Sequence, residues 1–223
     1  MRLYSGPLSM FGAKAEIAAL EKGLPVKVFM VPYGPQEGYS PKHPDVLRIN
    51  PKRQVPVLVD GDLEIFDSTQ IFEYFEHLKP DPALWPAEPR ARAAARLLEH
   101  KADEVYFPHI IRLMGLQDTP DDPAAVEARG GAAKVYEEFE GLLAGREFLA
   151  GDLFSYADIA FFMASLFGVR MGAEIGGDLP RLLDWRARTY ARPPVRQVAR
   201  TMADYLVSIG RKVPAFMDAK AVG

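Results

Sequence analysis

The chain has 223 residues, of which 48% are hydrophobic, and its 27 basic and 30 acidic side chains leave a formal net charge of −3. A chain of this length and apolar content builds one large domain or two small ones with a substantial core. The nearly balanced charge, without a long block of one sign, disfavours nucleic acid or a membrane surface as the partner.

Cysteine is absent, which excludes disulfide bonds, thiolate metal sites and a cysteine nucleophile from the protein itself. The histidines at positions 43, 77, 100 and 109 are nowhere three or four residues apart, so the sequence predicts no metal site. The longest apolar run begins at Ile159 and reaches about half of the ~20 residues that a membrane span requires. Without a signal-peptide pattern, a soluble cytoplasmic protein is expected.

The N-terminal segment predicts a strand, a helix and a second strand in succession. Leu3 and Tyr4 are typical of a strand end, and Ala13, Ile17, Leu20 and Leu24 then recur at helical spacing. Gly23 is suited to end this helix, and the β-branched run VKVFMV follows at 26–31. We therefore expect a βαβ unit whose two strands are parallel.

A second unit follows the loop at 32–44. A short helical segment at 45–50 leads to the runs VPVLV (55–59) and LEIF (63–66), and the turn signal Asp60-Gly61-Asp62 predicts a hairpin at their junction. The segment 67–78 then has apolar residues on one helical face. Residues 1–78 thus predict an α/β domain with the order βαβ-ββα.

The remainder of the chain changes character. Residues 79–89 contain four prolines and no periodicity, which indicates a linker, and helical patterns dominate over 90–223. We expect an all-helical second domain. Within it Ser155 and Asp158 have capping-box spacing, flanked by Phe154 and Ile159 as a hydrophobic staple, so Asp158 is interpreted as a folding residue and not a catalytic one.

Three loops of the first domain carry polar residues at places suited to a ligand. Ser9 precedes the first helix, where it either caps the helix or donates to an anion such as a thiolate. Val55-Pro56 is either an ordinary trans proline at a strand edge or a cis bond that presents the Val55 backbone to an extended ligand. Asp67 and Ser68 either cap the next helix or hold a zwitterion.

These features together resemble the cytosolic glutathione transferases over essentially the whole chain. The resemblance is carried by NPKRQVPVL, DSTQI, the proline-rich linker and FLAGDLFSYADIAF. It implies a thioredoxin-like first domain with a mixed four-stranded sheet, an all-helical second domain and a homodimer. It also implies a detoxifying enzyme that activates glutathione, as co-substrate and without a separate cofactor, to attack a small hydrophobic electrophile. Peroxide reduction and dehalogenation are variants of that attack. The alternative is a non-catalytic scaffold, because regulatory members of the family bind partners with this fold.

The resemblance implies roles for individual residues. Ser9 would donate to the glutathione sulfur, Val55 would pair with the cysteinyl backbone beside a cis Pro56, and Asp67 and Ser68 would hold the γ-glutamyl end. Gln54 matches zeta-like members, and Arg53 or Lys52 would reach the glycyl carboxylate. The chain departs from zeta enzymes at Ser9-Met10-Phe11, where they have Ser-Ser-Cys, and it has Asp67 where glutamate is more usual.

The electrophile is expected where the two domains meet. Pro108 is expected to interrupt the helix there, leaving a wall of adaptable apolar surface. We assign no catalytic role to His109. The predicted contacts are Met10, Phe11, Tyr106, Phe107, His109, Ile110 and Met114.

Overall fold

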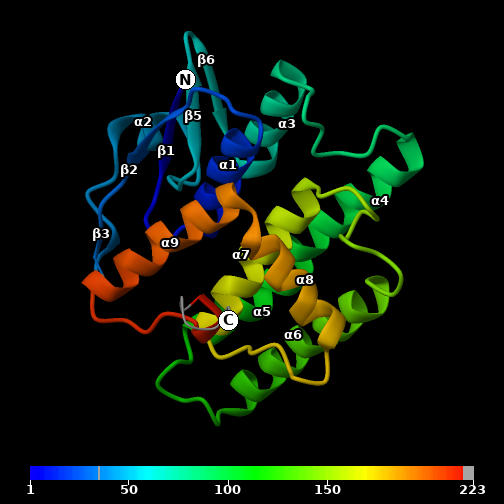
Figure 1. The fold of residues 1–223 in the computed structure, drawn as a ribbon. Helices are drawn as coiled ribbons and strands as arrows, with labels where there is room; N and C mark the ends of the chain where they lie inside the picture. The colour runs from blue at the N-terminus through cyan, green and yellow to red at the C-terminus, as the bar shows by residue number, and fades with distance from the viewer. Residues whose placement is uncertain (35, 218–223) are drawn as a thin grey trace. The chain divides into compact units, whose positions relative to one another are not determined.

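The structure is a computed structural model that describes residues 1–34 and 36–217 (Figure 1). The chain divides into two compact units, of which one contains residues 84–192 and the other contains residues 1–83 and the segment that begins at Pro193. We call them the helical unit and the sheet unit. The boundary at residue 83 lies within the predicted linker, 79–89. The prediction assigned all of 90–223 to the helical domain, whereas the segment from Pro193 on belongs to the sheet unit.

The sheet unit contains the predicted βαβ-ββα arrangement. Its elements are β1 (Arg2–Ser5), α1 (Met10–Glu21), β2 (Lys27–Met30), β5 (Val57–Asp60), β6 (Leu63–Phe66) and α3 (Ser68–Leu78). The strand order is β2-β1-β5-β6, with β1 parallel to β2 and antiparallel to β5, and with β5 antiparallel to β6. The predicted thioredoxin-like domain with a mixed four-stranded sheet is therefore confirmed.

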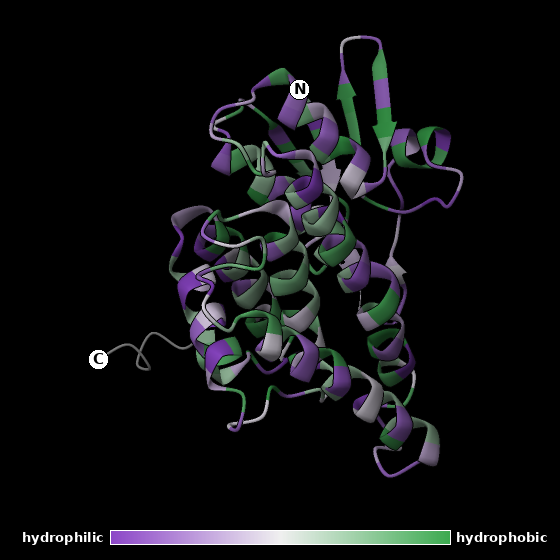
Figure 2. Ribbon diagram, turned by 90° about the vertical axis from the view of Figure 1, so that its right-hand side faces the viewer, coloured by the Kyte–Doolittle hydropathy of each residue, from purple (hydrophilic) through white to green (hydrophobic). Residues whose placement is uncertain are grey.

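The β5–β6 hairpin forms where the turn signal predicts it. Gly61 has a φ of 60°, a left-handed value that glycine adopts without the steric penalty of a Cβ atom. Apart from their charged residues, both strands are hydrophobic (Figure 2). The three valine and leucine residues of β5 are at most 5% exposed, so this strand is buried on both faces of the sheet.

One segment predicted as a loop contains regular structure. β3 (Tyr33–Gly34) and β4 (Gly38–Tyr39) pair as two short antiparallel strands, and their two tyrosine rings lie 5.0 Å apart. The predicted short helix follows as α2 (Pro44–Ile49). It contributes Val46 to a core cluster with Tyr4, Val31, Val57 and Val59. Because neighbouring strand residues alternate in direction, Leu3 and Leu58 face the opposite side of the sheet.

Helix α9 (Pro193–Ser208) completes the sheet unit. Its apolar side is buried at Val195, Val198, Ala199, Met202 and Leu206, and it contacts α1. The Tyr205 hydroxyl also donates a hydrogen bond to the Tyr33 carbonyl oxygen at 2.6 Å. A short 3-10 helix, η2 (Ala215–Met217), follows.

The helical unit is built around α7 (Tyr156–Arg170). The other elements are α4 (Pro89–His100), the π-helical segment η1 (Lys101–Tyr106), α5 (Phe107–Met114), α6 (Pro123–Leu142) and α8 (Pro180–Ala191). Contrary to the prediction, Pro108 does not interrupt the helix. Helical structure continues through η1, where the Phe107 amide donates to the Ala102 carbonyl, and Pro108 lies in the first turn of α5. Pro108 has no N–H to donate to the preceding turn, and the wider hydrogen-bond spacing of the π-helical segment accommodates the missing bond.

The predicted capping box is present at the start of α7. The Asp158 side chain accepts from the Ser155 amide and hydroxyl, both at 2.8 Å, and it is fully buried. Among residues 1–34 and 36–217, no helix is long and apolar enough to span a membrane, and no group of three or more potential metal ligands occurs.

Candidate functional site

The register of the sheet brings the three predicted loops to one edge. Tyr4 of β1 pairs with Val57 of β5, and Val57 pairs in turn with Phe66 of β6. The loop after β1, the residues before β5 and the residues after β6 therefore leave the sheet at the same end. These are the segments that carry Ser9, Val55-Pro56 and Asp67-Ser68, and their convergence at this edge was expected from the sequence.

Ser9 caps helix α1 and retains a proton to donate. Its backbone is extended, its side chain is half-buried, and Oγ accepts a hydrogen bond from the Gly12 amide at 3.0 Å. A hydroxyl has two acceptor lone pairs and one donor hydrogen, and the cap uses only a lone pair. The two interpretations of Ser9 are therefore compatible, because a capping serine at a helix N-terminus is also able to donate to an anion.

The Val55-Pro56 peptide bond is cis, as the second of the two interpretations anticipated. The preceding turn is braced by buried Asn50, whose side-chain amide donates to the Gln54 carbonyl at 2.6 Å and whose oxygen accepts from the Lys52 amide at 2.9 Å. Lys52, Arg53 and Gln54 are exposed on this turn. Asn50 was not singled out from the sequence, although an Asn-Pro pair is a turn signal.

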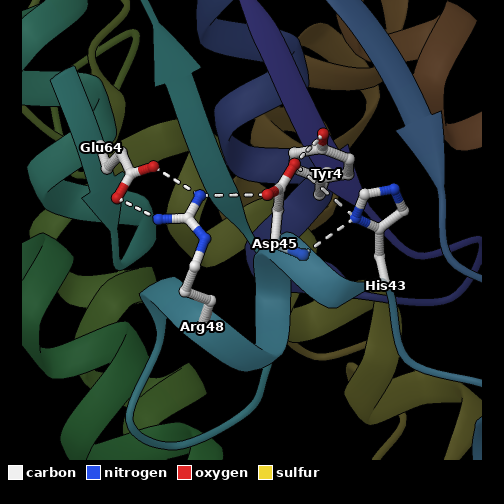
Figure 3. Close-up of polar contacts among 5 residues, drawn as sticks. All are labelled: Tyr4, His43, Asp45, Arg48 and Glu64. Atoms are coloured by element: carbon white, nitrogen blue, oxygen red, sulfur yellow. Dashed lines mark hydrogen bonds and ion pairs between the residues drawn. The ribbon is translucent and has the colours of Figure 1, made fainter. Parts of the chain in front are cut away.

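A polar network fastens α2, and with it the turn that follows, to the sheet (Figure 3). The Tyr4 hydroxyl donates to Asp45 at 2.5 Å, and Arg48 joins Asp45 at 3.0 Å to both carboxylate oxygens of Glu64 on β6 at 2.7 and 2.5 Å. The hydrogen bonds from Tyr4 and Arg48 lower the pKa of the Asp45 carboxyl. The His43 ring stacks 4.3 Å from the Tyr4 ring and caps α2.

Asp67 caps α3 in a strained backbone conformation. Its φ is 77° and its ψ is 131°, and one carboxylate oxygen, Oδ1, accepts from the amides of Thr69 at 3.0 Å and Gln70 at 3.2 Å. The Asp67 side chain is exposed. Ser68, the first helical residue, is 2% exposed. Strain of this kind, of order 1–3 kcal/mol, is concentrated at binding sites.

The residues predicted to bind the electrophile differ in accessibility. Phe11 and His109 are half-buried and Met114 is exposed, whereas the other four side chains are at most 8% exposed. Tyr106 and Ile110 belong to the core of the helical unit and not to a wall open to a ligand, which corrects the prediction. The Tyr106 hydroxyl contacts the Tyr136 hydroxyl and lies against Gly168, where a larger residue would collide with it. Met10 and Phe107 are likewise buried, at 2% and 8% exposure, which corrects the prediction for them as well.

Comparisons with known proteins indicate the family. One family model, described as glutathione S-transferase, N-terminal domain, matches residues 3–83, and another, described as glutathione S-transferase, C-terminal domain, matches residues 102–193. A glutathione S-transferase from Hyoscyamus muticus is 30% identical, over 86% of this chain and 94% of its own length. A stringent starvation protein A homolog from Coxiella burnetii is 31% identical over 71% of each chain. The crystal structure of a glutathione S-transferase domain-containing protein from Marinobacter aquaeolei aligns with a TM-score of 0.75 and 28% identity, covering 87% of this chain and 100% of that one.

Proposed function

We propose that this chain, which belongs to the glutathione S-transferase superfamily, is a glutathione transferase that presents glutathione as a thiolate to a small hydrophobic electrophile. The observation that carries the proposal is the Ser9 hydroxyl, which accepts its cap bond from Gly12 and keeps its own proton to donate, at the edge where three ligand-type loops meet. Phe11, two residues after Ser9 on the sheet unit, is a proposed electrophile contact, since its side chain is accessible.

The other loops supply complementary contacts for the rest of the tripeptide. The Val55 backbone is proposed to pair with the cysteinyl residue in the manner of an added strand. Asp67 Oδ2 and Ser68 would hold the γ-glutamyl ammonium and carboxylate, and Arg53, Lys52 or Gln54 would reach the glycyl carboxylate, because opposite charges form the stronger hydrogen bonds. Glutathione is the co-substrate in this scheme, and no separate cofactor takes part.

The energy that thiol activation requires is available at Ser9. A thiol with a pKa of ~8.5 is only a few per cent ionised at pH 7, and lowering that pKa by ~2 units requires ~2.7 kcal/mol of preferential stabilisation of the anion. A hydrogen bond to a charged group contributes ~1.5–3 kcal/mol, and a helix N-terminus adds ~0.3–1 kcal/mol. Together they suffice to make the bound thiol an effective nucleophile near neutral pH.

Thermal unfolding with and without glutathione tests binding. At a hundred times its dissociation constant, a ligand adds about 2.7 kcal/mol, so we expect the melting temperature to rise by roughly 5–10 °C. S-Methyl glutathione, which cannot ionise at sulfur, is the matched control and should still bind. An unchanged melting temperature at millimolar glutathione would contradict the proposal.

Ser9→Gly tests thiol activation. Glycine at an N-cap position loses only a few tenths of a kcal/mol of helix stability, yet it removes the hydroxyl, so this variant separates capping from activation. We expect conjugation of a model aryl halide to fall about ten- to a hundredfold in kcat, with glutathione affinity changed only a few-fold. Ser9→Thr, which keeps a hydroxyl, should recover part of the activity. Unchanged turnover in Ser9→Gly would assign activation to another group.

A second candidate function is a non-catalytic binding scaffold. One observation favours it, the similarity to a stringent starvation protein A homolog. A chain that serves as a binding scaffold does not require Ser9, Val55 and Asp67 to act together on a ligand. Glutathione binding without any measurable conjugation, combined with unaltered binding in Ser9→Gly, would support the scaffold over the enzyme.

We also propose a cellular location, an oligomeric state and a role for the enzyme. We place it in the cytoplasm as a homodimer with a role in detoxification. Gel filtration should then give a particle of about twice the mass of one chain, which is 24.8 kDa. A particle of single-chain mass would contradict the dimer without affecting the chemistry proposed at Ser9.

A further inference from the structure

A buried carboxyl group pairs with the residue that ends strand β1. The Ser5 hydroxyl donates a hydrogen bond to Glu16 Oε1 at 2.5 Å, and the two residues are 0% and 9% exposed. Burial raises the pKa of the Glu16 carboxyl to about 7, although the bond from Ser5 acts in the opposite direction. An ionisable group that is desolvated in this way weakens the fold when it is charged, so a functional reason for it is worth seeking.

Among residues 1–34 and 36–217, no charged partner explains the position of Glu16. The groove of about 190 Å³ beside it lies among α1, the segment 24–28 and α9, and none of the other described side chains that line it is titratable. The other buried ionisable residue in this part of α1, Lys14, has its ammonium group over the Phe11 ring. The lining residues besides Glu16 are Ala19, Leu20, Leu24, Val26, Val28, Gln197, Val198 and Thr201.

Gly12 connects this pair to Ser9. The Ser5 hydroxyl lies where a side chain at position 12 would begin, so any larger residue there would collide with Ser5 Oγ. The amide of the same glycine donates the 3.0 Å hydrogen bond to Ser9 Oγ. Glu16 thus holds Ser5, Ser5 supports the backbone of Gly12, and the amide of Gly12 orients the hydroxyl of Ser9.

We infer that Glu16 and Ser5 are positioning residues for thiol activation, which keep the Gly12 amide on Ser9 so that the serine proton is directed at the sulfur. This inference rests on the proposed function. An ionised Glu16 only accepts, so Ser5 must donate and has a single orientation, whereas a protonated Glu16 also donates and the bond can run in either direction. The alignment of Ser9 should therefore improve as Glu16 ionises.

The test compares Glu16→Gln and Ser5→Ala with Glu21→Gln, a control on the same helix that leaves the pair intact. The readouts are the ultraviolet absorbance of the bound glutathione thiolate against pH, and kcat and KM with a model aryl halide. We expect both variants to raise the bound thiol pKa by about one unit and to lower kcat about threefold at pH 7, because the thiolate fraction falls by that factor. KM for glutathione should change less than about threefold, because Val55 and Asp67 are untouched.

The sign of the change separates positioning from a direct charge effect. Removing a nearby negative charge would by itself favour a thiolate and lower the thiol pKa, so a raised thiol pKa in Glu16→Gln requires a change in alignment. Both proteins should show the inflection of the bound thiol in log kcat, and the wild type should show a second inflection close to pH 7 that Glu16→Gln lacks, since glutamine does not titrate.

Thermal stability separates positioning from a purely structural role. The folded-state pKa of Glu16 is raised from 4.5 to about 7, so wild-type stability should fall as pH rises through that interval. Glu16→Gln should therefore melt at a higher temperature than the wild type at pH 8, although it is the slower enzyme. If both variants bind glutathione and their thiol pKa values and pH profiles match those of the wild type, this inference is overturned and the proposed function stands. Failure of the wild type to bind glutathione would overturn the proposed function and this inference with it.

Discussion

Replacing Asp158 with alanine is expected to destabilise the helical unit by about 4–6 kcal/mol. The carboxylate is fully buried and accepts four hydrogen bonds, from the Leu149 amide at 2.9 Å, the Trp185 indole at 2.8 Å, and the Ser155 amide and hydroxyl at 2.8 Å each. Each buried donor left without an acceptor costs about 1–3 kcal/mol. A loss of this size is a large part of the 5–15 kcal/mol that typically separates folded from unfolded states.

Urea unfolding followed by tryptophan fluorescence checks this prediction directly. The two tryptophans of the chain, Trp85 and Trp185, both lie in the helical unit, so their emission reports on that unit. Asp184→Ala is the matched control, because Asp184 is exposed beside Trp185 and its loss should change stability by no more than about 0.5 kcal/mol. A loss below about 1 kcal/mol in Asp158→Ala would show that the four donors find other acceptors.

Replacing Lys22 with methionine should destabilise the sheet unit by about 3–5 kcal/mol. The Lys22 ammonium is fully buried, forms an ion pair with Glu76 at 2.6 Å, and donates to the carbonyl oxygens of Lys79 and Pro82 at 2.8 Å each. A methionine of similar length leaves the Glu76 carboxylate, which is 6% exposed, without this countercharge. Breaking a buried pair is costly because the remaining charge is still desolvated.

Hydrogen exchange locates the effect of this substitution. Amides in the last turn of α3 and in residues 79–83 should lose protection in Lys22→Met, and the urea midpoint measured by circular dichroism should fall. Lys79→Met removes an exposed ammonium group from the same segment and should behave as the wild type. Lys22→Met/Glu76→Gln should recover part of the loss, since it removes the buried charge. An unchanged midpoint in Lys22→Met would contradict the prediction.

The parts of the fold that the sequence predicted are those with local signals. The hairpin follows from β-branched runs around Gly61, and the capping box follows from the spacing of Ser155 and Asp158. The convergence of the Ser9, Pro56 and Asp67 loops was predictable because the order of strands and helices places them at one edge.

The features that were missed depend on contacts between distant residues. Helical spacing in α1 selected Ala13 and Ile17 for the core and gave no signal for Glu16, which is buried beside Ser5 of β1 and near Val198 of α9. Tyr106 was predicted to line the substrate site because it belongs to an aromatic and apolar segment. It lies in the core instead, where the hydroxyl of Tyr136 on α6 is the partner of its own hydroxyl. The positive φ of Asp67 has only a weak sequence signal, since aspartate adopts such values far less readily than glycine does.

The sheet unit is built from two separate stretches of the sequence, and this has a consequence for its synthesis on the ribosome. Helix α9 covers α1, yet it is made only after the whole of residues 84–192. At 5–20 residues per second, the nascent sheet would wait roughly 5–20 s with that side of α1 uncovered. The helical unit can complete its own contacts before the unit that precedes it. During translation, the part of the chain that emerges first is therefore the last to become complete.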